Sequence, residues 1–186
     1  MAARAAGSRT YVAFLRGINV GGKNLLPMKE LAAMFARAGA SDVRTYIQSG
    51  NVLFTATPTV AAKIAAAVTK AVAAKYGFEV ALVLRTQEEL AAVARANPYL
   101  TPDADHGRLL VMFLADAPAA RAVAALDPQR SPPDEFTVRG REIYLRCPNG
   151  FGRSKLSNAW FDAKLGTTST GRNWRTVLKL LELAGA

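Results

Sequence analysis

The chain has 186 residues, of which 51% are hydrophobic and 20% charged, so it holds enough apolar material for one compact domain or two small halves but no apolar run long enough to span a membrane. One cysteine, Cys147, excludes an internal disulfide, and with one histidine, His106, it offers too few ligands for a structural zinc site, so we expect a cytoplasmic protein without a cofactor. The formal net charge is +10 and is unevenly distributed along the chain. Lys and Arg outnumber Asp and Glu by seven to two in residues 1–57 and by nine to three in residues 139–186. Residues 58–138 hold eight Lys and Arg and nine Asp and Glu.

The first half of the chain predicts the element order β-α-β-β-α-β. Residues 1–9 are expected to be a disordered tail. Pro27 suits the first position of a helix, and Thr57 and Pro58 begin a second helix that Gly77 ends. The expected elements are a strand over residues 10–15, a helix over 27–38, a hairpin of strands 43–48 and 51–56, a helix over 58–76 and a strand over 78–84.

A linking helix and loop over residues 87–107 separate this first half, residues 10–86, from a second half over residues 108–186. Thr86 and Glu89 have the spacing of a capping box at the start of the linking helix. The elements expected in the second half are a strand over residues 108–116, a short helix over 118–126, a hairpin of strands 135–138 and 141–147, a helix over 154–164, an extended segment over 166–170 and a last helix over 172–183.

The repeated order predicts an α+β fold made of two duplicated ferredoxin-like units, each an antiparallel sheet with helices on one face, plus a C-terminal helix. The repeat is one of element order and not of residues. We expect the two halves to form one compact unit.

A Gly-rich loop, RGINVGGKN at residues 16–24, follows the first strand. Its spacing approaches that of a phosphate-binding P-loop, but Asn24 stands where that motif needs the Ser or Thr hydroxyl that binds Mg²⁺. The helix also begins late, at Pro27, and not directly after the glycines as in a P-loop. The loop is then either an anion-binding nest of backbone N–H groups or a plain turn. The candidate anion-binding residues of the loop are Arg16, Gly17, Asn19, Gly21, Gly22, Lys23 and Asn24.

A second marked string, TYIQSGNVLF, places Gln48, Ser49 and Asn51 between two predicted strands. These residues are typical of a hairpin turn, and the alternative is that they face a ligand beside the first loop.

Two basic segments in the second half are further candidates for anion contacts. Arg153 lies next to glycines at a predicted helix start. Arg172, Asn173 and Arg175 are expected in the first turn of the last helix, where positive charge opposes the helix dipole and requires a bound anion or an acidic neighbour.

The strings LRGINVGGKN, VRTYIQSGNVLF and KLGTTSTGRNWRTVLKL, in this order, resemble a bacterial family known as domain of unknown function 1697. The resemblance covers nearly the whole chain and implies a single-chain α+β fold of duplicated ferredoxin-like type. It implies no activity, because no reaction or catalytic residue is established for the family. Ser169, Thr170 and Gly171 lengthen the last string relative to the family pattern.

Three functions fit these features, and the first is a binding protein for a phosphate-bearing or other anionic ligand, nucleic acid included. In this interpretation, the positive charge forms a surface that binds the anionic ligand. The alternative is that the charge belongs to the solvated surface of an arginine-rich protein. Nucleic acid would need stacking aromatics on a sheet face. The aromatic residues on predicted strands are Tyr11, Tyr46, Phe54 and Tyr144.

The second function is an enzyme that stabilises charge on a small anionic substrate through Arg16, Lys23, Asn19, Gln48 and Arg172, with no catalytic residue assigned. The third is a structural or oligomeric interaction module, which a large exposed apolar patch would indicate. We do not expect a membrane partner, and catalysis is the less favoured of these functions.

Overall fold

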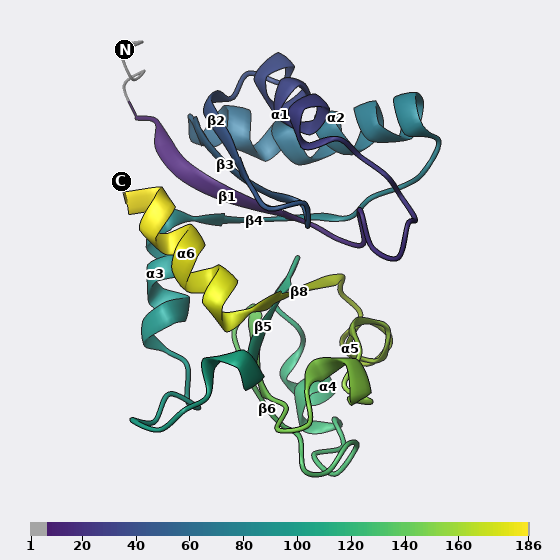
Figure 1. Cartoon of the computed structure of the whole chain (residues 1–186), viewed down its shortest axis with the longest axis vertical. Coiled ribbons are helices and arrows are strands. Elements are labelled where there is room, and N and C mark those ends of the chain that lie inside the picture. The colour runs from purple at the N-terminus through teal and green to yellow at the C-terminus, as the bar shows by residue number, and fades with distance from the viewer. Residues whose placement is uncertain (1–6, 186) are drawn as a thin grey trace. The chain divides into compact units, whose positions relative to one another are not determined.

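The computed structural model describes residues 7–185, which Figure 1 shows as a ribbon. The chain divides into two compact units, the first formed by residues 1–90 and 180–186 and the second by residues 91–179. The expected tail falls mostly on residues 1–6, which lie outside the described part.

The first unit contains a four-stranded antiparallel sheet in the order β2-β3-β1-β4, with two helices on one face (Figure 1). Its elements are β1 (Arg9–Leu15), α1 (Met28–Arg37), β2 (Ser41–Tyr46), β3 (Asn51–Ala56), α2 (Pro58–Tyr76) and β4 (Leu82–Thr86). Alternate side chains of β1, namely Tyr11, Ala13 and Leu15, share an apolar core with Phe35 of α1 and Val68 of α2. Burial of this face is what holds the helices against the sheet.

The second unit contains another four-stranded antiparallel sheet, in the order β6-β7-β5-β8. Its elements are a 3₁₀ turn (His106–Arg108), β5 (Leu109–Leu114), α4 (Ala120–Ala124), β6 (Glu135–Arg139), β7 (Glu142–Arg146), a second 3₁₀ turn (Phe151–Arg153), α5 (Asn158–Leu165) and β8 (Ser169–Asn173). Leu110 and Met112 of β5 pack with Ile143 of β7 and Phe161 of α5 in its core. The fold is therefore α+β with two antiparallel sheets, as the sequence predicts.

Two helices cross from one unit to the other along the chain. Helix α3 (Gln87–Arg95) begins in the first unit and ends in the second, and α6 (Trp174–Gly185) begins in the second and ends in the first. From the sequence, the terminal helix is expected to lie wholly in the second half. Its last turns instead belong to the first unit, where Nη2 of Arg44 donates to the carbonyl oxygen of Leu183 (2.9 Å).

The local signals for helix ends are confirmed. Oγ1 of Thr57 accepts a hydrogen bond from the amide of Val60 (3.4 Å), and Gly77 ends α2 in the left-handed region. Thr86 and Glu89 form a reciprocal capping box at α3: the amide of Thr86 donates to Oε2 of Glu89 (2.8 Å), and the amide of Glu89 donates to Oγ1 of Thr86 (3.1 Å).

The positive charge is shared equally by the two units. The first holds eleven Lys and Arg against six Asp and Glu, and the second thirteen against eight, so each carries a net charge of +5. The two basic segments, residues 1–57 and 139–179, fall in different units, which is why the units carry equal charge. Within residues 7–185, no helix is both long and apolar enough to cross a bilayer, and no three His, Cys, Asp or Glu side chains gather as a metal site.

Candidate functional site

The Gly-rich loop folds as a small β-hairpin directly after β1. The amide of Lys23 donates to the carbonyl oxygen of Val20 (3.0 Å), and the amide of Asn19 donates to that of Asn24 (3.1 Å). The Gly21–Gly22 pair at the tip has φ values of 57° and 74°, the left-handed values that both central residues of a type I′ turn require. The geometry thus supports the plain-turn interpretation of these two glycines.

The side chain of Asn19 joins this hairpin to the turn between β2 and β3. Its Oδ1 accepts from the amide of Leu26 (2.8 Å), and its Nδ2 donates to the carbonyl oxygens of Leu26 (3.0 Å) and Gln48 (2.8 Å). Nδ2 of Asn24 donates to the carbonyl oxygen of Gly17 (3.1 Å). Both asparagines have positive φ, which Asn adopts more readily than most residues. Their amides therefore fix the loop conformation, which is a different role from the predicted ligand contact.

We call residues 16–26 and 46–51 together the loop junction. Gly50 closes it, because its carbonyl oxygen accepts from the amide of Leu15 (2.8 Å) and its φ is 79°. A Cβ at Gly50 would lie 2.8 Å from Cβ of Leu15 and 3.0 Å from Cδ1 of Ile18, so only glycine fits there. The two strings RGINVGGKN and QSGN, which lie far apart in the sequence, thus meet in one structure.

Within the β2–β3 turn, the buried Asn51 serves the hairpin. Its Nδ2 donates to the carbonyl oxygen of Tyr46 (3.2 Å) and to Oγ of Ser49 (3.0 Å). Ser49 and Asn51 therefore fit the hairpin-turn interpretation, whereas the side chain of Gln48 is exposed.

The loop junction presents apolar side chains to solvent. Val20 and Leu25 are each 64% exposed and Ile47 is 50% exposed. Val20 directly follows Asn19 in the chain. Leu25 and Ile47 directly precede Leu26 and Gln48, the two residues that the Asn19 side chain binds. Ile47 also has a φ of 49°, which is rare for a β-branched residue and costs conformational energy. Exposed apolar groups and a strained backbone residue therefore occur together at the loop junction.

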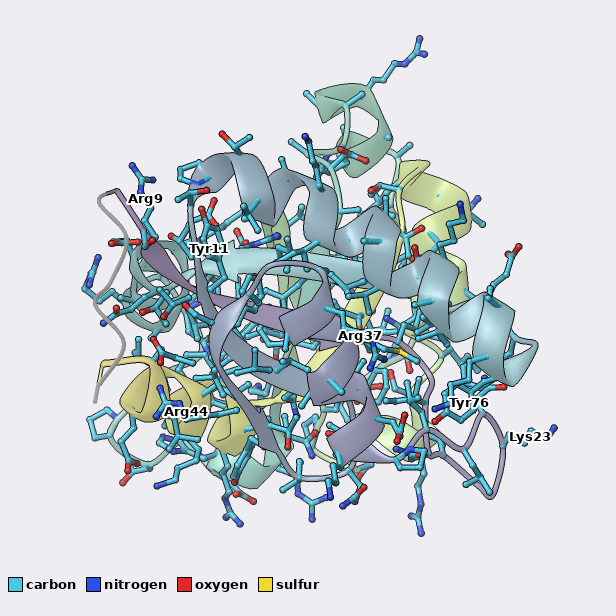
Figure 2. All side chains as sticks on the ribbon, turned by 90° about the horizontal axis from the view of Figure 1, so that it is seen from above. Arg9, Tyr11, Lys23, Arg37, Arg44 and Tyr76 are labelled. Atoms are coloured by element: carbon cyan, nitrogen blue, oxygen red, sulfur yellow. The ribbon has the colours of Figure 1, made fainter. Side chains whose placement is uncertain are left out.

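The loop junction is also basic. Residues 16–26 and 46–51 contain Arg16 and Lys23 and no Asp or Glu. Figure 2 shows Lys23 directed away from the ribbon at the hairpin tip, whereas Arg16 at the hairpin base is half-buried. A basic surface of this kind attracts anions.

The structure corrects the placement of Arg172 and Asn173. Both belong to β8 and not to the first turn of α6, and Arg172 lies opposite Val111 of β5. Nη1 of Arg172 donates to Oγ1 of Thr170 (3.0 Å) and to the carbonyl oxygen of Gly171 (2.8 Å). Burial lowers the pKa of this guanidinium, because desolvation disfavours its charged form.

The helix-dipole argument therefore applies to Arg175 alone. The acidic neighbour that it required is Asp105, whose Oδ1 lies 4.0 Å from Nη2 of Arg175. Arg153 lies in the second 3₁₀ turn, within the loop that follows β7. At the start of this loop, the amide of Cys147 donates to the carbonyl oxygen of Arg108 (2.8 Å). The candidate residues Arg153, Arg172 and Asn173 thus belong to the second unit, and the other candidates belong to the first.

The aromatic residues proposed for base stacking are largely buried. Tyr11 and Phe54 stack on each other inside the first core with ring centroids 5.4 Å apart. The hydroxyl of Tyr144 donates to the carbonyl oxygen of Val93 (3.2 Å), and burial raises the pKa of Tyr144 to about 12. Tyr46 is half-buried at the β2–β3 turn. Stacking on a sheet face would have to proceed without three of the four predicted aromatics.

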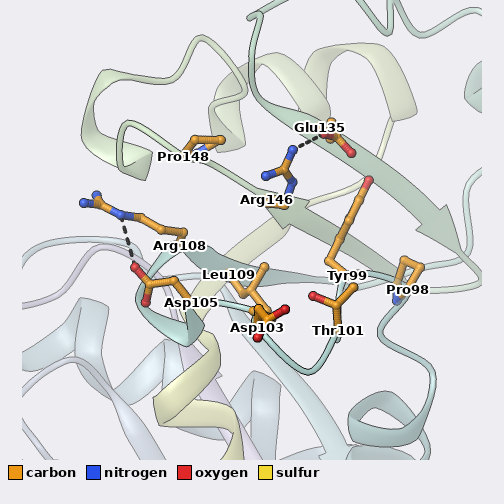
Figure 3. A pocket seen from close by; sticks show the side chains of 11 residues that line it. Pro98, Tyr99, Thr101, Asp103, Asp105, Arg108, Leu109, Glu135, Arg146 and Pro148 are labelled. Carbon is orange, nitrogen blue, oxygen red and sulfur yellow. Dashed lines mark hydrogen bonds and ion pairs between the residues drawn. The ribbon is translucent and has the colours of Figure 1, made fainter.

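A pocket in the second unit was not predicted from the sequence. It has a volume of about 560 Å³ and lies where β5, β7 and the loop after α3 meet. Figure 3 shows two ion pairs in its wall, Arg146–Glu135 and Arg108–Asp105. The only sequence signal was the loop LTPDADHGR, whose prolines and aspartates mark irregular structure without indicating a cavity.

Comparison with known proteins identifies relatives in family and fold. A family model described as "Protein of unknown function (DUF1697)" matches residues 9–144. The solved structure of conserved bacterial protein SP0830 from Streptococcus pneumoniae is similar, with a TM-score of 0.72 and 22% identity over 95% of this chain and 99% of that chain. At this identity the likeness shows the fold alone. Among curated proteins, no sequence matches the chain.

Proposed function

The chain belongs to the DUF1697 family of proteins of unknown function, and since this membership carries no activity, we propose that the protein binds a phosphate-bearing or other anionic ligand through the loop junction. The carrying observation is that two loops, which hold Arg16 and Lys23 and no carboxylate, are fixed together by the Asn19 side chain.

Rigidity supports this assignment. Five residues of the hairpin, from Gly17 to Asn24, have positive φ, and the asparagine amides hold the backbone between them. A surface that is already ordered loses little conformational entropy when a ligand binds. Arg16 and Lys23 then supply the charge, and the exposed amide of Gln48 can donate a hydrogen bond to an anionic oxygen.

The pocket of the second unit is a poorer anion site. Its wall holds Arg108 and Arg146 against Asp103, Asp105 and Glu135, so its formal charge is −1. We therefore place the anion at the loop junction of the first unit.

The test is binding of the full chain to single-stranded RNA, single-stranded DNA and pyrophosphate at several salt concentrations. We expect salt-sensitive binding of at least one probe, and Lys23→Gln should weaken it about fivefold to tenfold, because one phosphate contact is lost. Lys63→Gln, an exposed charge change on α2, is the matched control and should leave affinity within about twofold. Binding of pyrophosphate but of neither nucleic acid would assign a small ligand. If no probe binds, or if both variants bind as the unchanged protein does, the proposal fails.

A second candidate is an interaction module, favoured by the exposed Val20, Leu25 and Ile47. It predicts that the protein self-associates and that replacing Val20 and Leu25 by Asn shifts the sedimentation coefficient to that of the monomer. A monomeric unchanged protein at all accessible concentrations would count against a self-associating module. An enzyme acting on an anionic substrate stays an alternative, with less support because the Asn19 amide is engaged by the backbone of Leu26 and Gln48.

We also propose that the two halves are duplicated ferredoxin-like units of a cytoplasmic protein. The strand orders β2-β3-β1-β4 and β6-β7-β5-β8 are the same once equivalent strands are matched. Each half also ends in a helix that directly follows its last strand, so α6 is the equivalent of α3. The C-terminal helix is then the seventh element of the second repeat and no addition to it.

Residue-level agreement supports the duplication further. Arg85 lies opposite Val12, and Arg172 lies opposite Val111, at the same register in each half. Both arginines are buried, and in both Nη1 donates to the carbonyl oxygen of the preceding residue, at 2.7 Å for Arg85 and 2.8 Å for Arg172. In the sequence alone, the repeat is visible only in the order of elements.

A further inference from the structure

The pocket of the second unit differs in charge from the unit that contains it. The unit carries a net charge of +5, yet the pocket wall has a formal charge of −1. The lining residues are Pro98, Tyr99, Thr101, Asp103, Ala104, Asp105, Arg108, Leu109, Glu135, Arg146 and Pro148. All of them lie in residues 91–179, so the cavity is built within one unit.

Both arginines of the wall are already neutralised. Nη2 of Arg146 contacts Oε1 of Glu135, and Nε of Arg108 lies 3.5 Å from Oδ2 of Asp105 (Figure 3). Asp105 is engaged further, because its Oδ1 accepts from the amide of Gly107 (2.7 Å). An incoming anion would have to compete with these carboxylates for each guanidinium.

Asp103 is the remaining carboxylate of the wall. Among residues 7–185 it forms no ion pair or side-chain hydrogen bond, and it belongs to neither dashed pair in Figure 3. The pocket therefore offers one negative group whose charge is not balanced inside the wall.

Apart from Thr101, the rest of the wall is apolar or aromatic. Pro98, Leu109 and Pro148 line it together with Tyr99, whose hydroxyl is held by Oγ1 of Thr137 (3.0 Å). A hydrogen-bonded tyrosine is fixed in position and offers a ring face to an organic cation. A volume of about 560 Å³ lies within the range of small-molecule sites.

We propose that this pocket binds a small organic cation, a primary amine on a short apolar body, with the ammonium group on Asp103 and the body against Tyr99, Leu109 and the two prolines. The assignment is independent of the anion site proposed for the first unit. It gives a protein of high positive charge a site selective for the opposite class of ligand.

The test compares three probes of the same shape on the full chain: benzylamine, benzyl alcohol and benzoate. Backbone amide shifts in ¹H–¹⁵N spectra should saturate with benzylamine within residues 99–109 and 146–147. Benzyl alcohol should bind more weakly, and benzoate most weakly of the three. This order needs no variant, and equal or tighter binding of benzoate overturns the proposal, as do benzylamine shifts confined to other segments.

Two matched variants locate the charge. Asp103→Asn should weaken benzylamine binding about tenfold, since a charge-assisted contact is lost. Asp116→Asn removes the same charge from an exposed position of the second unit outside the pocket wall and should change affinity less than about twofold. Equal effects of the two variants would show that only the overall charge matters, and the proposed contact with Asp103 would be wrong.

Discussion

At the scale of single residues, the loop junction depends on side chains that replace backbone interactions. Asn19 binds both the amide and the carbonyl of Leu26, as a neighbouring strand residue would, and adds a bond to Gln48. The sequence could indicate that asparagines lie in a turn, because Asn is a standard turn former. It could not indicate that Asn19 reaches a segment 29 residues away, since that contact depends on the packing of the sheet.

Ile47 is the strained residue of the loop junction. Its left-handed backbone disfavours a β-branched side chain, so Ile47→Asn should raise the free energy of unfolding by about 1 kcal/mol, measured by urea denaturation. Val20→Asn is the control, because Val20 is at least as exposed and lies outside the positive-φ set; its effect should stay within about 0.5 kcal/mol. If the Ile47 variant is less stable than the Val20 variant, strain is not present at this position.

Cys147 gives a prediction about pH. Burial raises the pKa of its thiol to about 11, above the value of about 8.5 for an unfolded cysteine. Between these values the unfolded chain releases a proton that the native protein keeps, so the stability that the buried thiol contributes is complete below the unfolded pKa and decreases as pH rises.

We therefore expect the unchanged protein to lose about 1 to 2 kcal/mol relative to Cys147→Ala between pH 7 and pH 10, measured by urea denaturation at each pH. A constant difference between the two proteins over this range would contradict the burial of the thiol.

At the scale of elements, the contact between the β1 end and the β2–β3 turn allows no side chain at Gly50. Gly50→Ala should cost about 3 kcal/mol, because a Cβ would lie 2.8 Å from Cβ of Leu15 and φ is 79°. Gly21→Ala is the matched control: its φ is also positive, but nothing lies within 4 Å of the added Cβ, so the cost should be about 1 kcal/mol. Chemical denaturation measures the free energy of unfolding of both variants. Equal losses of stability would mean that the turn does not pack tightly against β1.

Most elements could be predicted from the sequence, because their signals are local. The capping box at Thr86 and the cap at Thr57 each depend on residues within one helical turn. Several boundaries differ, among them the start of α5, which is Asn158 and not residue 154, and two of them differ for a tertiary reason. Strand β4 begins at Leu82 and not at Phe78, whose ring packs on Tyr76 (centroids 6.2 Å apart) before the chain joins the sheet. Strand β8 extends to Asn173 because its residues pair with β5, which no local pattern reports.

At the scale of the whole molecule, the chain shares its last helix between the units. Leu180 of α6 is fully buried and belongs to the first unit. Leu180→Ala should therefore cost about 3 kcal/mol, measured by urea denaturation. Leu178, in the same helix, is 37% exposed, and Leu178→Ala should cost less than about 1 kcal/mol. Equal costs for the two variants would contradict the burial pattern of α6.

The candidate sites, too, could be predicted only in part from the sequence. The strings around Lys23 and Gln48 could be recognised because glycine, asparagine and lysine after a strand are unusual together, and the structure joins them. Arg172 could not be placed, because a strand ending where a helix begins has no separate signal. The cavity around Asp103 could not be predicted either, since its walls come from segments nearly fifty residues apart that only the second sheet brings together.

An anion site at the loop junction is tested most directly by titrating the full chain with pyrophosphate and recording ¹H–¹⁵N spectra. We expect saturable shifts in residues 16–26 and 46–51, which diminish as salt increases. Saturable shifts restricted to the second unit, or no saturable shifts at low salt, would contradict an anion site at the loop junction.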